Sequence, residues 1–379
     1  MTARPVATSA PLLETAPGDA AGEVLSRADL RREPARWDGV LAPAGPSGLF
    51  ASADWLDAWH RWLGPETEPR FELVRADGEP VGLLPLVVRR SGLGLRRLAM
   101  PVARVAPRSR IVADRDGAVA AALGRALDRV DVPLLATGRL PAADGTIAAF
   151  ERAGLRVRVR RVYALPQIDA SGAWDAYLAG LSKNLRRSIK QAPRKLAPFE
   201  LERVAAEADL HRVLAAVEQV SRRTWKHDAG TSLAASPAAF GFFRAVLEAA
   251  HRDGRMLTVL AWDRRTRPAR PVGFLFAVRF GDTLHALKTG YVDALAEHAI
   301  GTNLLATTVA AAFADPAVRS VDLDAVAGGA DYKLRWATRV AELVEAWVAP
   351  ADWRGGLLDR GLGAARSVHR RLGKLKDGS

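Results

Sequence analysis

The chain has 379 residues, of which 49% are hydrophobic and 26% are charged, so most of it should fold, and its length suggests two or three domains. It contains no cysteine, which excludes disulfides, thiolate catalysis and cysteine-ligated metals. The 55 Lys and Arg outnumber the 42 Asp and Glu, and the net charge of +13 favours polyanionic partners such as nucleic acid, an anionic membrane surface or a phosphorylated substrate. Arg-rich codon usage would give the same excess without any partner.

Metal binding and membrane spanning are disfavoured by the sequence pattern. The seven His residues have no paired ligand spacing, so we expect no metal site. No apolar run approaches the roughly 20 residues that span a bilayer. Residues 1–25 are rich in Ala, Pro, Ser and Thr and lack the apolar core of a signal peptide, so we expect a disordered leader and a cytoplasmic protein.

The first globular stretch begins near residue 50. Trp55, Trp59 and Trp62 recur at helical spacing after Ser52, a good N-cap residue, and this pattern is typical of a helix that packs into a core. Residues 71–90 predict two strands around an Asp77-Gly78 turn. A helix at 118–130, a buried strand at 133–137 and a helix feeding a strand at 146–159 follow.

The same order of elements recurs downstream. Residues 238–254 predict a helix, 257–280 a hairpin, 283–292 a strand, 302–314 a helix and 318–324 a strand. Both hairpins contain Pro-Val-Gly, at 80–82 and at 271–273. We infer duplication of one α/β unit, although the tripeptide is also a common way to leave a hairpin turn.

A strongly basic segment, residues 182–196, separates the two copies. Ser182 can cap a helix whose Leu185 and Ile189 face inward, and Pro193 should end it. Two interpretations stay open, a solvated helical face or a surface for a phosphate-bearing ligand or lipid. The segment has no acid and carries six cations: Lys183, Arg186, Arg187, Lys190, Arg194 and Lys195.

Two other stretches concentrate positive charge. Seven Arg residues and no acid occur between Arg89 and Arg110. Residues 353–376 have the pattern of a basic amphipathic helix that could lie on an anionic membrane, or pack on the globular part instead.

The segment from Leu284 to Trp336 predicts a strand, a turn, a helix that opens at Gly301 and Thr302, and a second strand. Unpaired N–H groups and the helix dipole can hold a phosphate at such a helix start. An ordinary βαβ unit with a Gly for close packing is the alternative.

An ordered set of short motifs gives the chain a family resemblance. From about Trp174 to Trp347 it resembles the BioF2-like acetyltransferase domain, a branch of the GNAT acyltransferase superfamily related to FemX-type tandem GNAT proteins, and residues 50–170 look like a degenerate first half. The motifs are SKNLRR at 182–187, TWKHDAGT at 224–231, PVGFLFAV at 271–278, LKTGYV at 287–292 and DYKLRW at 331–336.

The resemblance implies an α/β (α+β) fold of tandem GNAT-like domains, with mixed, mostly antiparallel sheets flanked by helices. Acyl-CoA would enter where the sheet splays between a fourth strand, 284–292, and a fifth strand, 318–323. The domains expected are a leader at 1–25, a degenerate GNAT-like domain at 26–170, a GNAT acyltransferase domain at 171–350 and the basic helix at 351–379.

Acyl-CoA or acetyl-CoA is the co-substrate that the resemblance implies, with no metal. Its pyrophosphate would lie at the turn formed by Ile300, Gly301, Thr302 and Asn303. The family loop usually reads Q/R-x-x-G-x-G/A, and residues 298–302 of this chain keep only Gly301.

Acyl transfer to an amine needs a base, and three candidates lie in this segment. Asp322 and Asp324 alternate onto one face of the expected strand, where two carboxylates could raise one pKa towards neutrality, and His298 lies beside the turn. Alternatively, the carboxylates cap the chain or pair with Arg335 or Lys333. The resemblance makes Tyr332 a possible proton donor.

Four residues are candidates for substrate binding. The resemblance places Lys333 near an anionic group of the substrate, while a snorkelling surface lysine is the alternative. The same two interpretations apply to Lys226, Lys288 and Tyr291. Trp336 is expected in the core.

These expectations combine into a cytoplasmic acyltransferase that acts on an amine or hydroxyl of a small molecule, lipid, sugar or cell-envelope precursor. The C-terminal helix could hold it peripherally at the inner face of the membrane. The alternatives are FemX-type aminoacyl transfer from aminoacyl-tRNA and a non-catalytic GNAT-fold partner in polysaccharide assembly.

Overall fold

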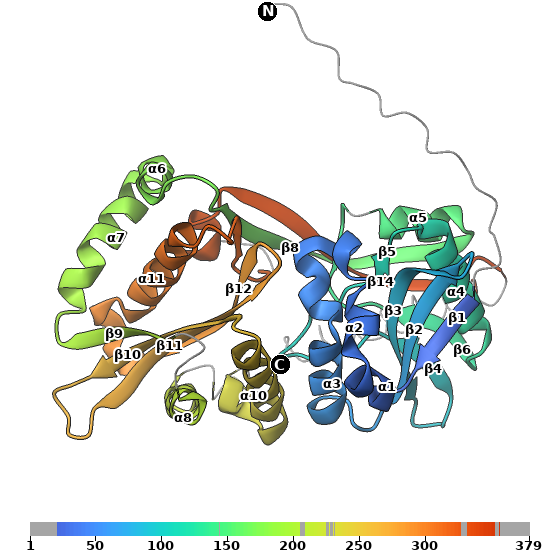
Figure 1. Ribbon diagram of the computed structural model, residues 1–379, viewed down its shortest axis with the longest axis horizontal. Helices are drawn as coiled ribbons and strands as arrows, with labels where there is room; N and C mark the ends of the chain where they lie inside the picture. Colours follow the sequence, from blue (N-terminus) through green and yellow to red (C-terminus); the bar gives the residue numbers. More distant parts are fainter. Residues whose placement is uncertain are drawn as a thin grey trace, which may run out of the picture.

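A computed structural model describes residues 21–143, 145–204, 209–224, 227, 230, 232–326, 332–352 and 356. Its strands form one mixed, mostly antiparallel sheet that runs through both halves of the molecule, with helices on its faces (Figure 1). The strand order is β1-β2-β3-β4-β6-β14-β8-β13-β12-β11-β10-β9, with β5 beside β3 and β7 beside β14. The predicted α/β class, with a mixed, mostly antiparallel sheet flanked by helices, is confirmed.

The N-terminal half is built on the predicted hairpin. Asp77 and Gly78 turn the chain with positive φ of 54° and 81°, and Ser52 caps the tryptophan helix by accepting from the Trp55 amide. Trp55 and Trp59 are buried, as expected. The elements are β1 (Ala21–Leu25), α1 (Arg27–Arg32), α2 (Pro34–Asp38), η1 (Ala42–Ala51), α3 (Ala53–Trp62), β2 (Glu68–Ala76), β3 (Glu79–Arg90), β4 (Arg96–Ala99), β5 (Val112–Ala113), α4 (Asp116–Asp128), β6 (Val132–Ala136), β7 (Leu140–Pro141), α5 (Thr146–Arg152) and β8 (Leu155–Asp169).

The expectation that a disordered leader extends to residue 25 is wrong. Residues 21–25 form β1, which pairs antiparallel with β2 from Ala21 opposite Arg75 to Leu25 opposite Phe71. Residues 1–20 lie outside the described part of the chain.

The C-terminal half repeats the order of the first, so that α3, β2, β3, β4, α4 and β6 correspond to α10, β10, β11, β12, α11 and β13. The elements are α6 (Trp174–Gly180), α7 (Lys183–Lys195), β9 (Phe199–Val204), α8 (Leu210–Ser221), η2 (Leu233–Ala235), α10 (Pro237–Arg252), β10 (Met256–Asp263), β11 (Arg270–Phe280), β12 (Thr283–Tyr291), η3 (Asp293–His298), α11 (Ile300–Ala314), β13 (Ser320–Asp322), η4 (Tyr332–Arg335) and β14 (Arg339–Pro350).

One glycine has the same packing role in each half. A Cβ on Gly82 would lie 2.3 Å from Val119 of α4, and a Cβ on Gly273 would lie 2.6 Å from Ile300 of α11. Each Pro-Val-Gly therefore lets the following helix pack directly against the hairpin. This shared role supports duplication more strongly than the shared tripeptide does.

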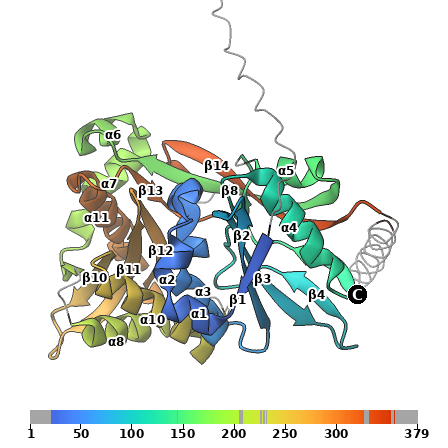
Figure 2. The same cartoon turned by 45° about the vertical axis from the view of Figure 1, so that its right-hand side comes forward.

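Two long strands, β8 and β14, join the halves (Figures 1 and 2). They pair with each other from Arg339 opposite Gln167 to Pro350 opposite Leu155. β14 also pairs with β6, whereas β8 pairs with β13, so strands of both halves are interleaved.

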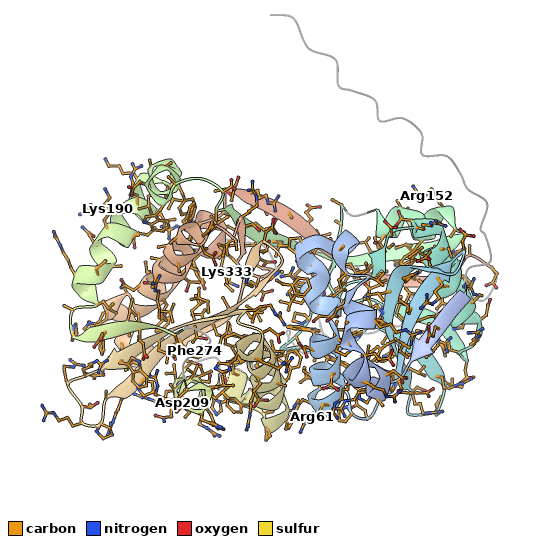
Figure 3. The ribbon with its side chains drawn as sticks, in the orientation of Figure 1. Arg61, Arg152, Lys190, Asp209, Phe274 and Lys333 are labelled. Carbon is orange, nitrogen blue, oxygen red and sulfur yellow. The ribbon has the colours of Figure 1, made fainter. Side chains whose placement is uncertain are left out.

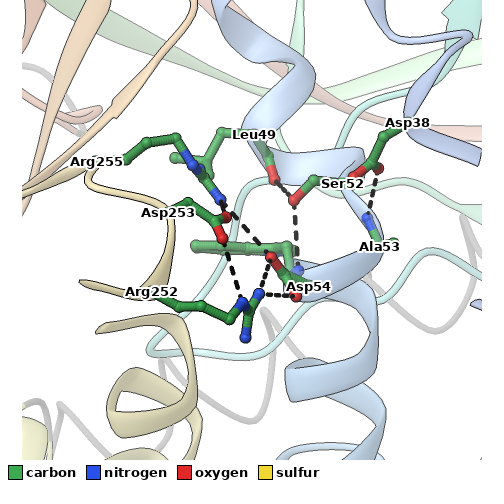
Figure 4. A network of polar contacts seen from close by, with 9 residues as sticks. Asp38, Leu49, Ser52, Ala53, Asp54, Arg252, Asp253 and Arg255 are labelled. Atoms are coloured by element: carbon green, nitrogen blue, oxygen red, sulfur yellow. Dashed lines mark hydrogen bonds and ion pairs between the residues drawn. The ribbon is translucent and has the colours of Figure 1, made fainter. Parts of the chain in front are cut away.

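Polar contacts also cross between the halves. Asp54, near the start of α3, contacts Arg252 at 3.1 Å and Arg255 at 3.6 Å, next to the end of α10 (Figure 4). In the same network, the Asp38 carboxylate accepts a hydrogen bond of 2.8 Å from the Ala53 amide. No helix among the described residues is long and apolar enough to cross a membrane.

The basic segment forms α7, with Ser182 as the predicted N-cap and with Leu185 and Ile189 buried. The prediction that Pro193 ends this helix is wrong, because α7 continues to Lys195. Burial of Ala192 and Leu196 on either side of Pro193 holds the last turn in place despite the lost backbone hydrogen bond.

Candidate functional site

A pocket of about 380 Å³ lies between α7, α11, the end of β12 and η4. The sequence pointed to four of its lining residues as site residues, namely Tyr291, Gly301, Thr302 and Tyr332. Its other walls come from Leu185, Ser188, Thr224, Leu275, Thr289, Gly290, Asp293, Leu305, Arg335 and Trp336. The pocket thus gathers segments that are far apart in the sequence.

The N-terminus of α11 opens onto this pocket. The preceding residue, Ala299, has a left-handed backbone with φ of 53°, and among the described residues no side chain caps the helix and no acid lies in its first turn. Gly301 and Thr302 both line the pocket, so amides that lack a partner within the helix lie at its edge. A Cβ on Gly301 would lie 3.0 Å from the Tyr291 ring, which explains the glycine.

The two other residues predicted for this turn have structural side chains. Ile300 is fully buried in the core. Asn303 is buried and its Nδ2 donates to the carbonyls of Ala192 at 2.9 Å and Ala299 at 3.0 Å, which ties α11 to α7. A ligand contact of the Asn303 side chain, as predicted, would break this tie.

Residues 332–336 of the DYKLRW motif supply the wall opposite β12. Tyr332 is 47% exposed, whereas Trp336 is buried, as predicted, although it also lines the pocket. The Tyr177 hydroxyl donates to the Trp336 carbonyl at 2.8 Å. Burial raises the pKa of Tyr177, so this hydroxyl keeps its proton and holds η4 in place. Lys333 is half-buried and is not one of the described lining residues.

The prediction that Asp322 and Asp324 share one strand face and raise a pKa is wrong. β13 ends at Asp322, and Asp324 follows it with φ of 65°. Asp322 is buried, and its Oδ2 lies 2.8 Å from Arg108 Nη1 and 3.3 Å from His285 Nδ1. Burial alone would raise the pKa of Asp322, but the charge of Arg108 and the contact with His285 outweigh it and hold the pKa well below its usual range. Asp322 is therefore half of a buried ion pair and not the general base. A base would need a higher pKa and access to the pocket.

His298 and Lys288 lie beside the pocket rather than in its lining. His298 Nδ1 is 3.0 Å from the Lys195 carbonyl, and its ring packs edge-on against Phe199, so it faces the end of α7. Lys288 lines a neighbouring cavity of about 190 Å³ and lies 5.0 Å from the Phe243 ring centroid. The two cavities share Thr224, Thr289 and Gly290. Lys226 lies outside the described residues.

Sequence reasoning missed Asp293 and Ser188, and it considered Arg335 only as a partner for a carboxylate. Asp293 is the one carboxylate among the described lining residues. Its position directly after β12 and at the start of η3 was a usable signal, because strand ends commonly supply site residues. Ser188 lies in the basic helix α7, and the local sequence has no signal that distinguishes it from the other polar residues there.

The outer face of α7 is cationic. Lys183, Arg187, Lys190, Arg194 and Lys195 are exposed, and within the described part of the chain none of them pairs with an acid. Arg186 donates to the Ala179 carbonyl at 2.6 Å. Figure 3 shows Lys190 on the outer side of the helix. Since Leu185 and Ser188 line the pocket, this positive surface borders it.

Comparisons with known proteins agree with this architecture. Residues 179–334 match the family model of an acetyltransferase (GNAT) domain. The chain resembles the crystal structure of FemX at 12% identity, with 86% of this chain and 96% of FemX covered and a TM-score of 0.62. A search of curated proteins finds no match.

Two other solved structures share the fold at 12% identity. One is the C-terminal domain of a putative lysylphosphatidylglycerol synthetase from Agrobacterium fabrum, with 89% of this chain and 97% of that chain covered and a TM-score of 0.55. The other is L-PGS from Bacillus licheniformis, with 84% and 92% covered and a TM-score of 0.52. Residues 179–334 therefore carry a GNAT domain, and the chain as a whole has a FemX-like fold.

Proposed function

We propose that this protein transfers an acyl group from acyl-CoA to an amine or hydroxyl, with the 380 Å³ pocket as its active site. The observation that carries the proposal is the start of α11, which is uncapped and acid-free among the described residues and borders a partly apolar pocket. A helix start of this kind favours phosphate oxygens, and the match to a GNAT domain supports acyl transfer as the chemistry of the pocket.

The lining residues fit a CoA thioester. The amides of Gly301 and Thr302 would hold the pyrophosphate, and the guanidinium of Arg335 would add positive charge on the facing wall. Leu275 and Leu305 offer apolar surface to the pantetheine or to an acyl chain. The cations of α7 lie along the border, where they would favour a ligand with several phosphate charges.

The transfer joins the acceptor nitrogen or oxygen to the thioester carbonyl carbon, and the C–S bond breaks to release a thiolate. The acceptor must lose a proton and the thiolate must gain one. Asp293 and Tyr332 line the pocket, and we assign them these tasks: the Asp293 carboxylate accepts the proton of the acceptor, and the Tyr332 hydroxyl donates to the sulfur.

A matched pair of glycine variants tests the donor site by calorimetry with acetyl-CoA and longer acyl-CoAs. Gly301→Ala adds a Cβ 3.0 Å from the Tyr291 ring, so we expect about tenfold weaker binding, which is about 1.4 kcal/mol. Gly124→Ala in α4 places its Cβ in open space and should bind like wild type. If the wild-type chain binds no CoA thioester, the proposal fails.

The cationic face of α7 favours a second candidate, aminoacyl transfer from aminoacyl-tRNA. This donor would place many phosphates on Lys183, Arg187 and Lys190 beside the pocket. Binding should then weaken steeply with salt, because each phosphate contact releases counterions. A tRNA gel shift at low salt that disappears in K183Q/R187Q/K190Q would support it, and the absence of any shift would remove it.

A further inference from the structure

The hairpin of β3 and β4 has an exposed apolar tip, residues 91–95. Leu93 is 87% exposed, the highest value for a large hydrophobic residue in the described part of the chain, and Leu95 is 43% exposed. The tip is held in shape by backbone hydrogen bonds of 2.9 Å from Ser91 to Leu95 and from Gly94 to Ser91, with Gly94 at φ of 78°. The turn therefore presents its leucines to the surroundings.

Four arginines stand directly behind this tip. Arg90 pairs with Arg96 and Arg89 with Arg97 across the two strands. Like charges opposite one another destabilise a sheet, so an anion beside them would offset their repulsion. Arg96 lies 3.4 Å from Asp131 and Arg89 lies 3.9 Å from Glu66. Arg90 and Arg97 form no ion pair with any described residue.

We propose that the hairpin tip at residues 91–95 docks on an anionic lipid membrane, with Leu93 and Leu95 in the acyl boundary and the four arginines at the lipid phosphates. The apolar side chains at the tip would reach the acyl region of a bilayer, and the arginines directly behind them would lie at the depth of the anionic headgroups. Nucleic acid has phosphates but no apolar layer for two leucines. The proposal does not depend on acyl transfer, since the hairpin belongs to the N-terminal half.

The hairpin lies at one edge of the molecule. Its strand β4 is at the lower right of Figure 2. Leu93 lies just past the Arg90 end of β3, and Glu79 lies at the other end. The two ends of an extended strand of 12 residues are about 36 Å apart. The two ends of one strand thus provide a test position and a control position.

Vesicle sedimentation of the full chain tests the docking. We expect binding to vesicles with 30% phosphatidylglycerol and little binding to pure phosphatidylcholine. L93S/L95S and R90Q/R97Q should each weaken this binding about tenfold. The matched control R267Q/R270Q removes two exposed arginines from another hairpin, β10–β11, and should bind like wild type. Binding that is unchanged in L93S/L95S would overturn the proposal.

A fluorescence measurement identifies the surface that makes contact. The chain has no cysteine, so Leu93→Cys and Glu79→Cys each accept one environment-sensitive dye. Anionic vesicles should shift the emission of the Leu93→Cys dye to the blue and leave the Glu79→Cys dye unchanged. An unshifted Leu93→Cys dye on protein that sediments with the vesicles would show docking by another surface. A shift caused by RNA and not by vesicles would likewise overturn the proposal.

Discussion

The half-buried carboxylate of Asp38 shows how one residue can control the response to pH. Burial raises the pKa of Asp38 to about 6, against an ordinary value of 3.8, even though the Ala53 amide donates to it. The folded state therefore binds more protons than the unfolded state between these values. The contribution of Asp38 to the free energy of unfolding is greatest below pH 3.8 and is lost as the pH rises through 6.

Asp38→Asn keeps the acceptor for the Ala53 amide and removes the charge. We expect the free energy of unfolding at pH 7 to rise by about 1–3 kcal/mol, with little change at pH 4. Urea unfolding at the two pH values measures this difference. A variant that is less stable than wild type at pH 7 would contradict the assignment.

Single residues also mark where sequence reasoning worked and where it failed. Gly301 could be predicted as a site residue because a glycine at the start of a helix can be recognised from the neighbouring sequence alone. Asp322 was misread because its partner, Arg108, is 214 positions away in the sequence. Local patterns predict helix starts and turns, but they do not show which charge will be buried against which.

Among the elements, α11 positions the candidate site, and its packing rests on Gly273. A Cβ there would lie 2.6 Å from Ile300 and 3.1 Å from Leu304. We expect Gly273→Ala to lower stability by about 1–3 kcal/mol and to weaken acyl-CoA binding, because it displaces the start of α11.

Gly82→Ala is the matched control for this prediction. Its Cβ would lie 2.3 Å from Val119, so stability should fall by a similar amount, but α11 stays in place. Thermal unfolding and calorimetry below the unfolding temperature separate the two effects. Equal losses of acyl-CoA binding in both variants would show that α11 packing is not the cause.

Element types were largely predictable, because the hairpins, the tryptophan helix and the basic helix each follow a local period. The residues at which these elements end were harder to predict. Pro193 was expected to stop α7, but burial on both sides of it outweighs one lost hydrogen bond. The pocket forms because η4 lies across from β12. The periodicity of the local sequence cannot predict a contact between segments that are distant in the chain.

At the scale of the whole molecule, the buried pair of Arg108 and Asp322 fastens the two halves. Arg108 comes from the N-terminal half, stacks 3.9 Å from the Phe50 ring centroid and contacts Asp322 at the end of β13. Removing Arg108 leaves the charge of Asp322 buried with only His285 beside it, which costs more than the pair itself contributes.

We therefore expect Arg108→Met to lower the free energy of unfolding by about 3–5 kcal/mol. Arg152→Met, which removes the exposed contact with Asp116, should cost less than about 1 kcal/mol. Denaturant unfolding of both variants measures the contrast. A loss below about 1 kcal/mol for Arg108→Met would show that the halves do not depend on this pair.

The interleaving of β14 sets the order in which the protein can be completed during synthesis. β6 ends at Ala136, but its neighbour β14 spans Arg339–Pro350. The strands of the N-terminal half therefore cannot all pair until more than half of the chain has been synthesised after β6. At about 5–20 residues per second, the edge of β6 stays open for about 10–40 s. An open strand edge is where chains pair wrongly, so a nascent chain of this protein should depend on chaperones most during that interval.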